Sequence, residues 1–137
     1  MTLQAQLASY CAAFNGRNLD AVLSLFAEQA LFEMPLLGQR LIGKGEIAAG
    51  FRRIFEVSQS ATITLSATRE SNQVAIAEGN MVAKLHRDTA PVELPLAMTL
   101  EGRDGEIARL STYLDARPYR LWADGPIFAA TNSAANQ

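Results

Sequence analysis

Residues 61–87 read ATITLSATRESNQVAIAEGNMVAKLHR, and this stretch decides the fold. Its first part alternates isoleucine, leucine and alanine with threonine and serine, the period of two that is typical of a strand with one buried face. Ser71-Asn72 predicts a turn, and residues 73–87 then predict a second, longer strand. Gly79 lies inside that strand and favours a bulge, at which a curved sheet would bend.

Two further strands are predicted downstream. Residues 92–102 are mostly apolar, and Pro95 among them favours a sheet edge or a bulge. Arg103-Asp104-Gly105 is a strong hairpin signal. Residues 106–117 then alternate again until Pro118 ends the pattern. The C-terminal half of the chain therefore predicts four antiparallel strands.

The sequence upstream of this sheet has helical periodicity instead. Apolar residues at helical spacing predict a first helix over residues 3–14, which Asn15-Gly16 ends. The side chain of Asn18 can cap a second helix by accepting a free backbone N–H. The buried face of this second helix is expected to include Phe26.

A short apolar run at residues 30–35 predicts one strand, residues 36–43 a loop, and residues 44–56 a third helix. Three N-terminal helices packed on a curved antiparallel sheet make an α+β domain. Such a sheet wrapped on helices leaves a cone-shaped apolar cavity, a natural site for a small molecule. We expect the domain to occupy residues 1–122, with residues 123–137 as a C-terminal tail.

Composition excludes several classes of function. The 137 residues suit a single domain, and 12 basic against 14 acidic side chains leave a net charge of −2. The chain therefore lacks the basic surface that nucleic acids or anionic membranes require. It has neither a signal peptide pattern nor an apolar run of about 18 residues, so we expect a cytoplasmic protein. With one cysteine and one histidine, no disulfide, metal site or cofactor is predicted.

Short strings along the chain carry a resemblance to a known superfamily. They are YCAAFN at 10–15, NLDAVLSLFA at 18–27, FEMP at 32–35, GKGEI at 43–47, and GEI at 105–107 leading to YLD at 113–115. Over residues 3–122 the chain resembles the nuclear transport factor 2-like superfamily, the cystatin-like, cone-shaped α+β barrels. Ketosteroid isomerase, limonene epoxide hydrolase and the SnoaL-like polyketide cyclases belong to it. The resemblance implies the fold but not the activity, because this scaffold supports many chemistries.

The resemblance also implies which positions would be catalytic, and most of them have changed. The hydrogen-bonding tyrosine of ketosteroid isomerase falls on Tyr10, its base on Met34, and its protonated aspartate on about Ala97. A thioether cannot abstract a proton, and a methyl group cannot donate one. The polar residues of limonene epoxide hydrolase fall on Leu31, Glu33, Gly79, Met81 and Thr112, and none is retained in kind. Neither known activity is therefore expected.

Glu33 is the carboxylate nearest the expected cavity mouth. Walled by phenylalanine and methionine side chains, it would have a raised pKa and could act as a general acid or base. The alternative is a solvent-facing residue, because Glu33 and Met34 point to opposite faces of their strand.

Tyr10 and Thr112 could donate hydrogen bonds into the cavity. The alternative for Tyr10 is a core aromatic residue whose hydroxyl finds another partner. Thr112 shares a strand face with Leu110 and Leu114, and we expect this face to line the cavity. If Ser111 and Tyr113 face inward instead, all assignments on this strand fail together. The other expected ligand contacts are Phe14, Phe32, Met34, Phe51, Phe55, Met81, Ala97, Leu110 and Leu114.

Two functions remain open. One is a non-catalytic module that binds a small apolar molecule. The other is an isomerase or cyclase of a small carbonyl or polycyclic compound, with Glu33 as base and Tyr10 and Thr112 as donors. We also expect a homodimer through the outer sheet face, which is too apolar for water and too polar for a core. In the alternative, the tail covers this face with Trp122, Ile127 and Phe128.

Overall fold

The computed structural model describes residues 2–86 and 88–115. Several expectations lie outside the described residues. They are the strand end at Pro118, Trp122, and the tail at 123–137 with Ile127 and Phe128. In chain order the described elements are α1 (Leu3–Asn15), α2 (Leu19–Ser24), β1 (Phe26–Met34), the 3₁₀ turn η1 (Pro35–Leu37), β2 (Gln39–Ile42), α3 (Gly43–Val57), β3 (Ser58–Ser71), β4 (Val74–Leu85), β5 (Val92–Arg103) and β6 (Glu106–Leu114).

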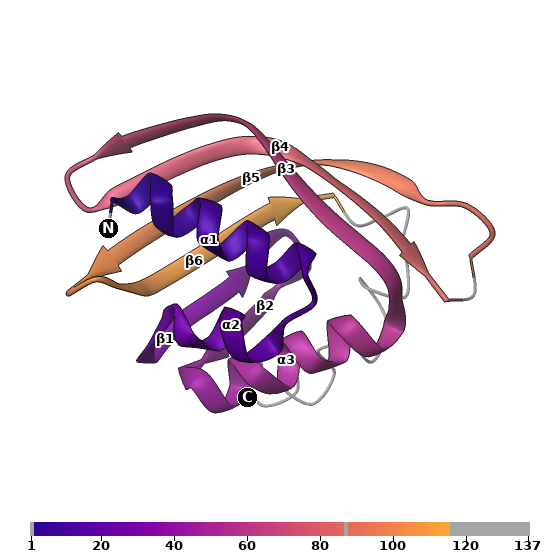
Figure 1. The fold of residues 1–137 in the computed structure, drawn as a ribbon, viewed down its shortest axis with the longest axis horizontal. Helices are drawn as coiled ribbons and strands as arrows, with labels where there is room; N and C mark the ends of the chain where they lie inside the picture. The colour runs from indigo at the N-terminus through magenta and orange to yellow at the C-terminus, as the bar shows by residue number, and fades with distance from the viewer. Residues whose placement is uncertain (1, 87, 116–137) are drawn as a thin grey trace.

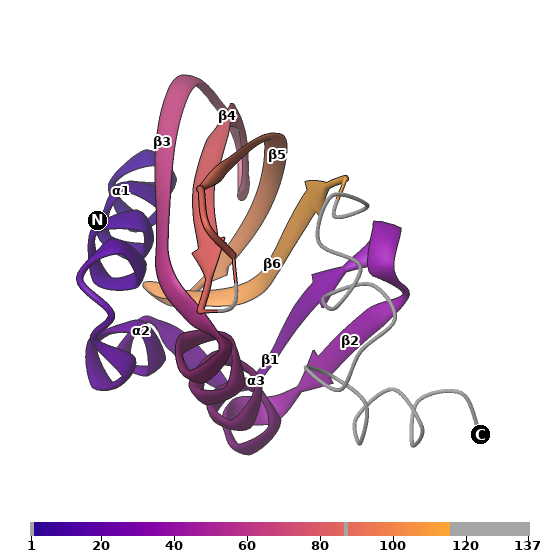
Figure 2. The same cartoon turned by 90° about the vertical axis from the view of Figure 1, so that its right-hand side faces the viewer.

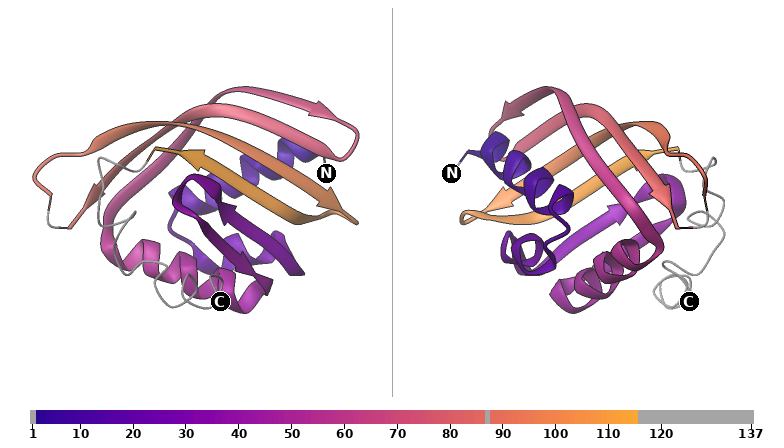
Figure 3. Two further views of the ribbon diagram at one scale, coloured as in Figure 1. Left: turned by 180° about the vertical axis from the view of Figure 1, so that it is seen from behind. Right: turned by 45° about the vertical axis from the view of Figure 1, so that its right-hand side comes forward.

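The described strands form one curved sheet with the order β2-β1-β6-β5-β4-β3. The three helices lie on its concave side (Figures 1 and 2). Seen from behind, the convex face is not covered by α1, α2 or α3 (Figure 3). This arrangement confirms the α+β fold class with helices packed on a curved sheet. Among the described helices, none is both long and apolar enough to cross a membrane.

The sheet differs from the expectation at one pair of strands. β1 runs parallel to β6, while the other neighbouring pairs are antiparallel. The sheet is therefore mixed rather than antiparallel throughout. Sequence periodicity reports which face of a strand is buried but carries no information about the direction of its neighbour.

Two asparagine side chains at the junction of α1 and α2 make hydrogen bonds that hold this part of the fold together. Asn18 caps α2 as predicted, since its Oδ1 accepts from the Ala21 N–H at 3.0 Å. The Asn15 side chain pairs with the free edge of β3, donating to the Ile63 carbonyl at 2.9 Å and accepting from the Ile63 N–H at 2.8 Å. An edge strand exposes unpaired backbone groups, and Asn15 occupies two of them.

The predicted bulge is present beside Gly79. Gly79 pairs with Leu65 while Glu78 pairs with Ala67, so Ser66 is the extra residue on β3. The Ser66 hydroxyl donates to the Glu78 carbonyl at 3.1 Å. The bulge lets the two long strands curve around α1 (Figure 1).

Pro95 lies in β5, an interior strand, rather than in an edge strand. Pairing between β5 and β6 begins only at Leu96, opposite Leu114. Pro95 is thus just beyond the paired part of β6, where its missing N–H leaves no ladder bond to β6 unmade.

Two boundaries were expected elsewhere. The predicted loop at 36–43 contains β2, whose four residues are too few to show a period in sequence. Phe26 begins β1 instead of ending the second helix, because the Ile107 N–H donates to the Leu25 carbonyl at 2.8 Å and draws the chain into the sheet.

Candidate functional site

A small cavity lies between α1, α3 and the concave face of the sheet. Its volume is about 20 Å³, enough for roughly one water molecule. The lining residues are Tyr10, Phe14, Phe32, Met34, Phe51, Ile54, Ile63, Met81 and Thr112. Seven of the nine carry no polar side-chain atom other than sulfur, so the cavity is apolar apart from two hydroxyls.

The Thr112 hydroxyl is unsatisfied. Thr112 is 4% exposed, and within the described residues no group hydrogen-bonds its Oγ1. A buried hydroxyl without a partner costs free energy, about 1 to 3 kcal/mol. Thr112 Oγ1 is therefore a group that a ligand or a water molecule would satisfy.

Tyr10 supplies the second hydroxyl from α1. Burial, and to a smaller extent the neighbouring Cys11 thiol, raises the pKa of the Tyr10 hydroxyl well above its ordinary value of 10.0. The phenol therefore stays protonated at physiological pH and can donate a hydrogen bond. Together, Tyr10 and Thr112 present neutral donors to an uncharged cavity.

Four of the nine lining residues are aromatic. Phe51 of α3 lies at the centre, with its ring centroid 4.9 Å from Phe32, 6.0 Å from Tyr10 and 6.1 Å from Phe14. The tilted and edge-on ring pairs are the arrangements that aromatic quadrupoles favour. The wall is therefore packed and leaves little free volume.

The structure brings together most of the expected ligand contacts. Phe55 packs on Phe14, with ring centroids 5.7 Å apart, but does not line the cavity. Leu110 and Leu114 lie buried in the same core without reaching the cavity. Ile54 and Ile63 also line the cavity, although neither was an expected contact. Both show a signal in sequence, since Ile54 shares a helix face with Phe51 and Ile63 is on the apolar face of its strand.

The expectation for Ala97 is wrong. In β5 the buried residues are Leu94, Leu96, Met98 and Leu100, so Ala97 lies on the outer face. The resemblance gave this position only to within about one residue, and a difference of one residue reverses the face of a strand.

Glu33 lies on the opposite face of the sheet from the cavity. Phe32 and Met34 line the cavity, and the strand's alternation turns Glu33 outward. The expectation that aromatic side chains wall in this carboxylate is therefore wrong, and so is its expected raised pKa.

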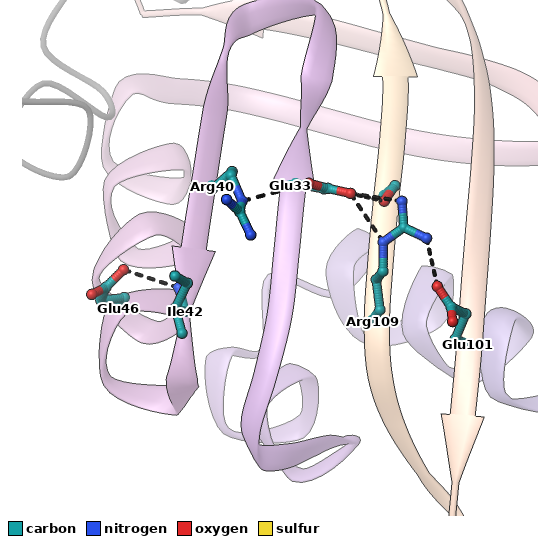
Figure 4. Close-up of polar contacts among 7 residues, drawn as sticks. Glu33, Arg40, Ile42, Glu46, Glu101 and Arg109 are labelled. Carbon is teal, nitrogen blue, oxygen red and sulfur yellow. Dashed lines mark hydrogen bonds and ion pairs between the residues drawn. The ribbon is translucent and has the colours of Figure 1, made fainter. Parts of the chain in front are cut away.

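On the outer face Glu33 belongs to an ionic cluster of Glu33, Arg40, Glu101, Arg109 and Ser111 (Figure 4). Glu33 Oε1 accepts from Arg109 Nε at 3.0 Å, from Arg109 Nη2 at 2.7 Å and from Ser111 Oγ at 2.8 Å. Arg109 also donates to Glu101, and Arg40 Nε lies 3.9 Å from Glu33 Oε2. We refer to these five residues as the outer cluster.

The outer cluster holds Glu33 ionised. Partial burial alone would raise the pKa of Glu33, but hydrogen bonds from Arg109 and Ser111, with the charges of Arg109 and Arg40, hold it below its ordinary value of 4.5. A carboxylate whose pKa is lowered in this way is a poor base, because its ionised form is stabilised. The cluster is a structural feature of the sheet face.

The lowered pKa of Glu33 makes part of the stability pH-dependent. A group whose pKa is lower in the folded than in the unfolded state stabilises the fold fully at a pH above its unfolded-state pKa. It loses that contribution as the pH falls through its folded-state pKa. At pH 7 we expect Glu33→Gln to lower the free energy of unfolding by about 1 kcal/mol, since Arg109 is partly exposed. The difference from wild type should shrink between about pH 5 and pH 3.

Urea denaturation at several pH values measures this effect. Glu78→Gln is the matched control, because Glu78 is an exposed carboxylate on the same sheet face. A difference between wild type and Glu33→Gln that stays constant down to pH 3 would contradict the role of the ionised carboxylate.

Metal and thiol chemistry find little support in the described residues. Within 2–86 and 88–115, no three His, Cys, Asp or Glu side chains lie close enough to hold a metal ion. Cys11 is buried, and burial raises the pKa of its thiol to about 11, which leaves it protonated.

Several solved structures share the fold of this chain at low sequence identity. A protein of ketosteroid isomerase-like fold from Catenulispora acidiphila, in complex with trimethylamine, is 19% identical over 93% of this chain and 97% of its own, with a TM-score of 0.80. A nuclear transport factor 2-like protein of unknown function from Burkholderia pseudomallei is 16% identical, with coverages of 89% and 97% and a TM-score of 0.78.

Two others carry names that refer to chemistry. A protein proposed to be a polyketide cyclase, from Xanthomonas campestris, is 22% identical over 88% of this chain and 96% of its own, with a TM-score of 0.72. TerC, co-crystallised with polyporic acid, is 16% identical over 89% and 98%, with a TM-score of 0.76. At such identities these likenesses establish the fold alone.

Sequence comparison points to one family. No curated protein matches the chain. The family model of the SnoaL-like domain matches residues 7–110, which is well over half of the chain. The chain belongs to the SnoaL-like family, within the nuclear transport factor 2-like superfamily.

Proposed function

We propose that the protein is a cytoplasmic module that binds a small, uncharged, mostly apolar molecule carrying one hydrogen-bond acceptor. The observation that carries the proposal is the unsatisfied Thr112 hydroxyl in an apolar cavity, beside the Tyr10 phenol. A carbonyl oxygen would accept from both hydroxyls. No charged side chain lines the described cavity, so an ionic ligand would be buried there without a counter-charge.

The size of the cavity requires a movement on binding. About 20 Å³ cannot hold a drug-sized ligand. Met34 and Met81 are the flexible lining residues, and their unbranched side chains can repack around a guest. Ligand entry is therefore expected to displace these two methionines.

The catalytic alternative has less support. Glu33, its base, lies on the far side of the sheet from the cavity and is bound by Arg109 and Ser111. The described cavity contains no carboxylate or imidazole that could take over this role. Of the structural neighbours, one binds trimethylamine and another was crystallised with polyporic acid. Both ligands would need the cavity of this chain to enlarge.

A matched pair of ligands tests the proposal. Acetophenone carries a carbonyl where α-methylstyrene carries a methylene group of similar shape. We expect wild type to bind acetophenone roughly fivefold more tightly, the equivalent of one neutral hydrogen bond of about 1 kcal/mol. Titration followed through the NMR signals of the methionine methyl groups gives both dissociation constants.

Thr112→Val should reduce the preference for acetophenone to the part that Tyr10 supplies, and Thr112→Ser, which keeps the hydroxyl, should retain it. Tyr10→Phe should reduce the preference. Binding of neither compound to wild type would refute the proposal, and so would an unchanged preference in Thr112→Val.

We further propose that two copies of the chain pair through the convex face of the sheet. Ile76 and Val82 of β4 are 52% and 42% exposed on this face, a large apolar exposure for a sheet surface in water. The outer cluster lies farther along the same face, and its two acidic and two basic side chains leave it neutral in charge.

Sedimentation equilibrium at micromolar concentration distinguishes a 14.8 kDa monomer from a species of twice that mass. We expect the dimer in wild type and the monomer in Ile76→Lys. Leu36→Lys, at an exposed leucine in the 3₁₀ turn η1 rather than in a sheet strand, is the control and should remain dimeric. A wild-type protein that sediments as a monomer would rule the pairing out.

A further inference from the structure

A second unsatisfied polar group lies in the same row of the sheet as Thr112. Gln39 of β2 pairs with Met34 of β1. The register of β1 on β6 pairs Phe32 with Leu110, and continuing it by two residues brings Met34 beside Thr112. Gln39, Met34 and Thr112 are all buried on the concave face. They form a row across three neighbouring strands.

Gln39 needs a hydrogen-bond donor. It is 5% exposed, and its Nε2 donates to the Leu37 carbonyl at 3.1 Å. That bond fixes the orientation of the amide and leaves Oε1 as the free group. In the described part of the chain nothing donates to Gln39 Oε1. Burying an amide oxygen without a donor destabilises the fold, so Gln39 Oε1 is a group that a guest molecule or a water would satisfy.

The Thr112 hydroxyl and the Gln39 amide oxygen require complementary partners, an acceptor and a donor. Neighbouring strands lie about 4.8 Å apart, so the Cα atoms of Gln39 and Thr112 are separated by roughly 10 Å. A single aromatic ring that carries a polar group at each end spans a distance of this order once its two hydrogen bonds are included. Thr112 offers a donor and Gln39 an acceptor, so the guest must be polar at both ends in opposite senses.

We propose that the ligand site extends from Thr112 across Met34 to Gln39, and that it takes a ring with a carbonyl at one end and a hydroxyl or N–H donor at the opposite end. A para-hydroxyaryl ketone is the simplest member of this class. This inference rests on the proposed function, because it starts from the same cavity and the same Thr112 contact. Gln39 itself lies outside the cavity lining, so the site reaches it only when Met34 moves aside. Met34, which lies between the two polar groups, is the side chain that the ring displaces.

Para-hydroxyacetophenone and para-methylacetophenone form the test pair, since they differ by a donor hydroxyl against a methyl group of similar size. In wild type we expect the hydroxyl compound to bind roughly fivefold more tightly. In Gln39→Met, which replaces the amide by an apolar side chain of similar length, this preference should disappear. Gln39→Leu provides a second variant should Gln39→Met fold poorly.

Thr112→Val is the matched control, because it should weaken both compounds by the same factor and keep the preference for the hydroxyl. A hydroxyl preference that persists in Gln39→Met and Gln39→Leu would overturn the inference, since water or another group would then accept the hydrogen bond from the hydroxyl. Equal binding of the two compounds to wild type would also overturn it. Acetophenone itself separates the two proposals: if it binds and the para-hydroxyl adds nothing, only the extension to Gln39 fails.

Discussion

Replacing Phe51 by alanine is expected to lower the free energy of unfolding by about 3 to 5 kcal/mol, a large part of the stability of a domain this size. Phe51 is fully buried, and its ring is 4.9 to 6.4 Å, centroid to centroid, from five other aromatic rings. Replacing it removes the ring through which α3 packs on α1 and β1. The cavity left behind adds to the loss of burial, because packed neighbours relax only partly.

Urea denaturation followed by circular dichroism measures the loss. Phe55→Ala is the matched control, one turn along α3, where the side chain is only half-buried and contacts fewer rings. We expect Phe55→Ala to cost clearly less than Phe51→Ala. Similar losses for the two variants would mean that the aromatic cluster has no centre and that the cavity wall tolerates the vacancy.

The long strands could be predicted because each buries one face. Alternation over β3 and β6 places Ile63 and Thr112 toward the helices, and both line the cavity. The same rule already contained the answer for Glu33. Because Phe32 and Met34 flank it, a cavity containing those two residues cannot contain Glu33 on the same strand.

Pairing between distant segments could not be predicted. Whether β1 runs parallel to β6 depends on where the chain returns after four intervening strands, and no local pattern records it. The outer cluster follows from that pairing. Arg109 and Ser111 reach Glu33 only because β6 lies beside β1, across more than 70 residues of sequence.

Of the two unsatisfied polar residues discussed above, Thr112 and Gln39, only one could be recognised in the sequence. Thr112 could be found, since it interrupts an apolar strand face. Gln39 could not, because its strand has four residues and reads as a loop. Its burial, and the absence of a described donor for its Oε1, are properties of the assembled sheet.

Gly79→Ala is expected to destabilise the protein by about 3 kcal/mol, at the upper end of what an added methyl group costs in a packed site. A Cβ at position 79 would lie 2.1 Å from the Thr64 carbonyl oxygen and 2.9 Å from the Leu65 Cα. Both are backbone atoms of β3, so no side-chain rotation relieves the clash. The strands must separate at the bulge, which breaks ladder bonds on both sides of it.

Equilibrium unfolding in urea gives the loss, and amide hydrogen exchange locates it. We expect faster exchange at the amides of β3 and β4 near Thr64 and Leu65, with β5 and β6 less affected. Gly45→Ala is the matched control: a Cβ there meets nothing within 4 Å, and the helical position should gain up to about 1 kcal/mol. If Gly79→Ala proves as stable as wild type, the strands are farther apart at position 79 than the bulge geometry requires. Curvature of the sheet would then not depend on the absence of a side chain there.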